Sequence, residues 1–152
     1  MTISVYLNRD AGLRILMFEG QITRSQYSRL VDIYNDPDVF DAHHRSVTIF
    51  AENIGLSDLT AADHGPLDQA VGNALARARA TVRLKSAVVA LSLSALTELR
   101  LWLDLAKPST RDRIDIASFT NLEDAVAWHG LSPEWVQNIK DLRQLERVGH
   151  FS

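Results

Sequence analysis

The chain has 152 residues, of which 46% are hydrophobic and 23% charged, a balance typical of a globular protein with one core. Sixteen lysines and arginines against nineteen acidic residues give a net charge of −3, so no nucleic-acid partner is expected. The absence of cysteine excludes disulfides and thiol nucleophiles, and it favours a cytoplasmic location. Neither an integral membrane segment nor a signal peptide is expected, because no apolar run approaches roughly 18 residues and residues 1–18 lack the order of a leader.

Hydrophobic periodicity and turn residues predict short strands and helices in alternation. In the first half we expect a hairpin within 2–20 with its second strand at 13–18, a helix from a cap at Thr23 or Ser25 to about 35, a strand at 46–51 and a helix at 66–80. In the second half we expect a strand at 86–91, a helix at 94–106, a strand at 114–119, a helix from a cap at Asn121 to 128, and a last helix opened by Ser132-Pro133-Glu134.

This order of elements predicts the fold class. Strands that alternate with helices need crossover connections, which favour an α/β fold with a largely parallel sheet. The hairpin at the start of the chain, turned at Gly12, adds an antiparallel strand. A mixed sheet of about five strands is therefore expected.

Three segments resemble the SpoIIAA-like proteins, a bacterial family related to the STAS anti-sigma-factor antagonists. They are Phe18-Glu19-Gly20-Gln21-Ile22-Thr23, Lys85-Ser86-Ala87-Val88-Val89, and the stretch from Phe119 to Trp128 with its Phe-x-x-x-x-x-Ala-x-x-Trp pattern. The resemblance implies helices mainly on one face of the sheet and a domain over 1–131. Residues 132–152 are then a helical extension, packed on the same domain or on a dimer partner. Glu52 to Ser57 replaces the phosphorylated turn of STAS proteins, so no phosphoacceptor is assigned.

The helix predicted at 94–106 has more apolar surface than one buried stripe requires. Leu96, Leu99, Trp102, Leu103 and Ala106 cover one face. Leu101 and Leu105 lie on nearly the opposite side, where they contact either the C-terminal segment or another chain. In that segment Trp135, Ile139, Leu142 and Leu145 form a further apolar stripe. Our first hypothesis is a non-enzymatic cytosolic interaction or regulatory domain, a homodimer that uses Leu101, Leu105, Trp135, Ile139 and Leu142 and needs no cofactor.

Two other functions stay open. The SpoIIAA-like fold is similar to that of CRAL-TRIO lipid-transfer proteins, which implies a carrier of a small apolar ligand with Trp102 and Phe119 at its pocket. A metal-assisted hydrolase would use His43, His44 or His64. No His-Glu-x-x-His motif, nucleophile elbow or phosphate loop supports catalysis, so an enzyme is not the expected reading.

Overall fold

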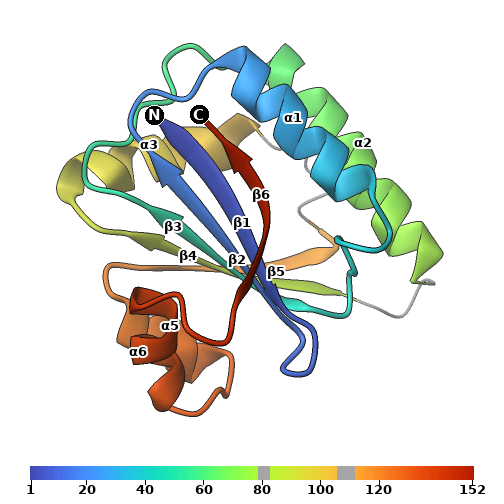
Figure 1. Ribbon diagram of the computed structural model, residues 1–152. Coiled ribbons are helices and arrows are strands. Elements are labelled where there is room, and N and C mark those ends of the chain that lie inside the picture. The colour runs from blue at the N-terminus through green and yellow to red at the C-terminus, as the bar shows by residue number, and fades with distance from the viewer. Residues whose placement is uncertain (79–82, 106–111) are drawn as a thin grey trace.

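A twisted mixed sheet runs through the molecule, with helices on both of its faces (Figure 1). The computed structural model describes residues 1–78, 83–105 and 112–152. The strands are β1 Thr2–Asn8, β2 Leu13–Glu19, β3 Arg45–Phe50, β4 Leu84–Ala90, β5 Ile114–Phe119 and β6 Glu146–Phe151. The helices of the described residues are α1 Arg24–Asn35, α2 Ala61–Arg77, α3 Leu93–Leu105, α5 Leu122–Trp128 and α6 Glu134–Lys140. Ala106, the last residue expected in the third helix, lies outside the described ranges.

The strand order is β5-β4-β3-β2-β1-β6. Strands β2 to β5 are parallel neighbours, joined by the expected crossovers, whereas β1 runs antiparallel to both β2 and β6. Gly12 has the positive φ, +60°, that the tight turn between β1 and β2 requires. The predicted α/β class and mixed sheet are confirmed, and the sheet has one strand more than the five expected.

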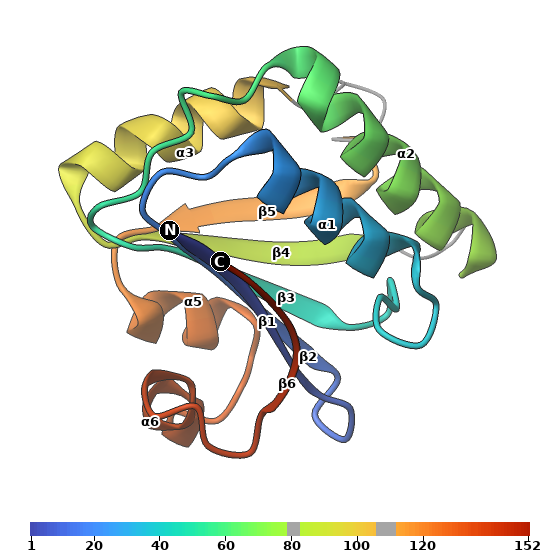
Figure 2. The ribbon, with the colours of Figure 1, turned by 45° about the horizontal axis from the view of Figure 1, so that its top comes forward.

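Helices α1, α2 and α3 cover one face of the sheet, and the two short helices α5 and α6 cover the other (Figure 2). Each core layer follows from the period-two alternation of the strands. Leu16 and Phe18 of β2 belong to the core under α1–α3, while Leu13 and Ile15 belong to the core under α5 and α6. Along each of these strands, neighbouring residues therefore lie in opposite core layers, and residues two positions apart lie in the same layer.

Helix α1 begins as the sequence predicts. The Thr23 hydroxyl accepts a hydrogen bond from the Gln26 backbone N–H at 3.2 Å, and the Gln26 side chain accepts one from the Thr23 N–H at 2.9 Å. This reciprocal capping box satisfies two N–H groups that a helix start leaves unpaired. The Gln26 amide nitrogen also donates to the carbonyls of Met1 and Phe151, so the two chain ends lie side by side, as Figure 1 shows.

Helix α2 starts earlier than predicted. It begins at Ala61, and Pro66, expected at the first turn, lies inside the helix. The Asp63 carboxylate accepts hydrogen bonds from the backbone N–H and the hydroxyl of Thr60, at 2.8 and 3.0 Å. The expected start at 66 was wrong: the helix begins at the cap formed by Thr60 and Asp63, and Pro66 lies in its second turn.

The prediction of a wholly helical extension over 132–152 was also wrong. Helix α6 ends at Lys140, and Leu142 and Gln144 then take positive φ values of 55° and 60°. Backbone of this kind ends a helix, since L-residues pay a steric cost in the left-handed region. The chain then forms β6, which pairs with β1 and supplies the hydrogen bonds that an edge strand leaves unmade.

Candidate ligand-binding site

A cavity of about 60 Å³ lies between the sheet and the three helices α1–α3. That space holds about four or five water-sized groups. Its walls are largely apolar side chains from β4, β5, α2 and α3, namely Leu67, Val71, Leu84, Val88, Leu103 and Ile114. A partly open space of this kind, lined by apolar groups with a few polar ones, is the usual form of a small-molecule site.

Polar side chains cross the floor of this cavity. Arg14 on β2, Ser46 on β3 and Ser86 on β4 are direct neighbours in the register of three parallel strands. Thr48 lies two residues further along β3 on the same face, and all four residues line the cavity. The row thus brings a cationic residue and three hydroxyl-bearing residues to one wall of the cavity.

Arg14 is the most unusual member of this row, because its side chain is fully buried at 0% exposure. Its guanidinium carbon lies 4.0 Å from the centre of the Phe40 ring, and one terminal nitrogen donates to the Asp41 carbonyl at 3.3 Å. Within the described residues, its Nε atom and second terminal nitrogen have no hydrogen-bond partner. Burial lowers the pKa of Arg14 from its usual value, although the charge of Asp41 acts against this.

A hydrogen-bonded chain of buried side chains borders the cavity. The Trp102 indole N–H donates to the Tyr27 hydroxyl at 2.9 Å, and that hydroxyl lies 2.6 Å from Nδ1 of His64. Nε2 of His64 faces the Asp68 carboxylate at 3.6 Å, which favours the ring proton on Nε2. With that tautomer, Nδ1 accepts a hydrogen bond from the Tyr27 hydroxyl.

These hydrogen-bonded side chains are suited to holding the wall of the cavity in place rather than to nucleophilic chemistry. The Tyr27 hydroxyl is hydrogen-bonded to both Trp102 and His64, and burial raises the pKa of Tyr27 far above its ordinary value. Burial likewise lowers the pKa of His64, with the charge of Asp68 as a smaller opposing effect. His64 is therefore held neutral, which fits a histidine that accepts from Tyr27.

The two residues predicted to line a pocket are separated by the sheet. Trp102 of α3 lines the cavity, as expected. Phe119 of β5 does not: it lies on the opposite face, where its ring centre is 6.0 Å from that of Trp128. The alternation of side chains along β5 places Phe119 on that face. Ile114 and Ile116 point into the cavity, so the odd-numbered residues of β5 point away from it.

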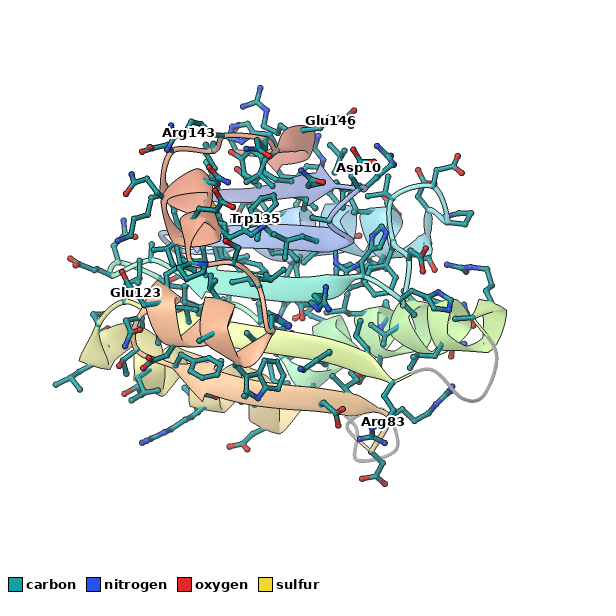
Figure 3. All side chains as sticks on the ribbon, turned by 90° about the horizontal axis from the view of Figure 1, so that it is seen from below. Asp10, Arg83, Glu123, Trp135, Arg143 and Glu146 are labelled. Atoms are coloured by element: carbon teal, nitrogen blue, oxygen red, sulfur yellow. The ribbon has the colours of Figure 1, made fainter. Side chains whose placement is uncertain are left out.

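The residues predicted for an interface have different degrees of burial. Leu101 is 56% exposed and Leu142 is 39% exposed, while Ile139 is 1% exposed within the core under α5 and α6. Leu105 is half-buried, and so is Trp135, which extends from α6 over the sheet (Figure 3). The face of Ile139 is therefore covered by its own domain, and Leu142 lies in a turn.

Of the three histidines considered for a metal site, His43 and His44 lie beside the Asp41 carboxylate in one loop, at 2.8 and 3.9 Å. His64 lies apart from them, in the core beside Tyr27. Across the part of the chain that the structure describes, no group of three or more histidine, aspartate or glutamate side chains is arranged to hold a metal ion. Likewise, none of the helices in these ranges is both long and apolar enough to cross a bilayer.

The sequence prediction missed Arg14 and the hydroxyl row. The sequence does contain a signal for Arg14, namely its position in the alternation. Arg14 lies two residues before Leu16 and four before Phe18, so it shares their face of the predicted strand. A charged residue at such a position is rare unless it has a partner. The register that aligns it with Ser46 and Ser86 requires the tertiary structure.

No protein-family model matches the chain, and no curated protein or solved structure is significantly similar to it. The resemblance to SpoIIAA-like proteins thus stays a prediction.

Proposed function

We propose that this chain is a binding protein that takes a small, mostly apolar molecule into the cavity beneath α2 and α3. The observation that supports this proposal is the cavity itself, with aliphatic walls and a localised polar floor. Well-packed cores seldom retain a space of this size without an occupant. The engaged hydroxyl of Tyr27 favours binding over catalysis.

The proposal predicts that blocking the cavity abolishes binding. Val71 is 6% exposed and lines the cavity, so Val71→Phe places a ring in the space the ligand would use. We expect 1-butanol to shift the backbone amide NMR signals of β3 and β4 in the wild type and to leave them unchanged in Val71→Phe. Asn73→Phe, an exposed site on the same helix, is the control and should bind as the wild type does.

Native mass spectrometry of freshly expressed protein gives a second measurement. A retained ligand raises the native mass above the denatured mass. A clean apo mass together with no butanol-induced shift at β3 and β4 contradicts the proposed function.

A second function, self-association as a homodimer, is favoured by one side of α3. Leu93, Leu101 and Leu105 follow the i, i+4 spacing of a helix ridge, and the first two are 85% and 56% exposed. Leucines exposed in this way mark contact surfaces when they are grouped. Light scattering is expected to give twice the chain mass of 17.0 kDa. A monomer mass at every concentration contradicts this second proposal.

A further inference from the structure

The buried arginine on the cavity floor indicates the chemistry of the ligand. Arg14 is fully buried, and its Nε atom and one terminal nitrogen have no partner among the described residues. Asp41 accepts a hydrogen bond from Arg14 with its backbone carbonyl, while its carboxylate bonds to the His43 ring at 2.8 Å. A buried guanidinium that keeps its charge needs an anionic partner or several acceptors.

The π faces of Phe40 and Tyr34 meet part of this need. The guanidinium carbon lies 4.0 Å from the Phe40 ring centre and 5.9 Å from that of Tyr34. Ring faces attract a cation, but they accept no in-plane hydrogen bond from its N–H groups. The aromatic contacts therefore hold the guanidinium in place, while its Nε atom and one terminal nitrogen keep unmade hydrogen bonds among the described residues.

We propose that the cavity binds a short monocarboxylate, with the carboxylate on Arg14 and the apolar chain against Val71 and Val88. This inference rests on the proposed function and adds the class of ligand. The planar donor fork of arginine matches the two oxygens of a carboxylate. The Ser46 and Ser86 hydroxyls lie next to Arg14 in the same cross-strand row and can donate to the same anion.

Size and charge narrow the class further. A cavity of about 60 Å³ accommodates a short acid rather than a long-chain lipid. Arg14 supplies one positive charge, which balances a monoanion. Asp68 and His64 line the α2 side of the cavity, and the Asp68 carboxylate repels an anion there. The ligand carboxylate is thereby directed to the Arg14 end.

The test compares butanoate with 1-butanol, two probes of equal chain length that differ in charge. We expect NMR titration of the wild type to give a butanoate Kd at least tenfold lower than the butanol Kd. Arg14→Met, which keeps an unbranched apolar side chain but lacks the guanidinium and its charge, should abolish that preference and leave butanol binding within twofold of the wild type. Arg14→Lys should retain part of the preference.

Each outcome separates the two proposals. Equal affinity for butanoate and 1-butanol in the wild type overturns the carboxylate assignment and leaves the proposed function standing. Failure of both probes to bind overturns both proposals. Inorganic phosphate that binds more tightly than butanoate assigns the site to phosphate and overturns the carboxylate class. If Arg14→Met does not fold, the comparison of the two probes on the wild type still tests the carboxylate assignment. In addition, Ser86→Ala should weaken the binding of butanoate more than that of butanol.

Discussion

At the residue scale, the buried histidines of this protein are held neutral by what surrounds them. His64 accepts from Tyr27, and Nε2 of His129 donates to the Ser46 carbonyl at 2.8 Å. Burial is the largest effect on the pKa of each, and it lowers the pKa below the usual 6.5. Protonating His64 at Nδ1 would also replace an acceptor by a donor that faces the Tyr27 hydroxyl. Acid is therefore expected to destabilise this part of the core.

The direction of the pH effect follows from linkage. As pH falls below 6.5, the histidines of the unfolded chain take up protons, while His64 in the folded state stays neutral to a lower pH. The contribution of His64 to the unfolding free energy is thus constant above pH 6.5. Below pH 6.5 it decreases by at most about 1.4 kcal/mol per pH unit. Urea unfolding at pH 7.5, 6.5 and 5.5 measures this slope.

His64→Gln should give a shallower slope between pH 6.5 and 5.5 than the wild type. Asn73→Gln is the control, because it changes an exposed, non-titrating side chain of the same helix and should leave the slope unchanged. A wild-type slope in His64→Gln would contradict the assignment. The carboxylates with lowered pKa values, Asp41, Asp63 and Glu123, take up protons well below this pH window.

At the element scale, β6 completes the sheet and closes one edge of the core under α1–α3. Phe151 at its end is 8% exposed, and the Arg29 guanidinium lies 4.8 Å from the centre of its ring. At the other end of β6, Arg9 pairs with Glu146 at 2.9 Å, near Asp10 at the β1–β2 turn (Figure 3). That pair is exposed and contributes little to stability. The aromatic residue, rather than the ion pair, is therefore expected to fix this strand.

Phe151→Ala should lower the unfolding free energy by about 3 kcal/mol, since it removes a buried ring and leaves a cavity at the edge of the core. Arg147→Ala is the control on the same strand, and its exposed side chain should change stability by less than about 0.5 kcal/mol. Urea unfolding measures both changes. Equal effects of the two substitutions would show that β6 is held by its backbone hydrogen bonds alone.

At the scale of the whole molecule, the sheet separates two layers with different properties. The α1–α3 side contains the cavity and the buried charge, whereas on the side of α5 and α6 the side chain of Ile139 is buried and that of Trp135 is half-buried. The C-terminal segment packs on its own domain. Any contact between copies is therefore expected at α3 rather than through the face of Ile139.

The association proposal predicts a specific effect of charge on α3. Leu93→Asp combined with Leu101→Asp should convert a dimer to a monomer in light scattering, because a buried interface excludes unpaired carboxylates. Ser94→Asp adds the same charge to an exposed position of the same helix and should leave the mass unchanged. A dimer that persists in the double variant would place the contact elsewhere.

The sequence by itself determined the alternation of strands and helices and the mixed sheet, and it limited the cap of the first helix to Thr23 or Ser25, because these depend on periodicity and on contacts between residues close along the chain. It did not determine β6, whose pairing with β1 joins residues almost a full chain length apart. Nor did it place Phe119 on the far face or align Arg14 with Ser46 and Ser86. Strand register and the choice of face are set when distant segments pack, and only the tertiary structure brings a buried cation and two hydroxyls into one cavity.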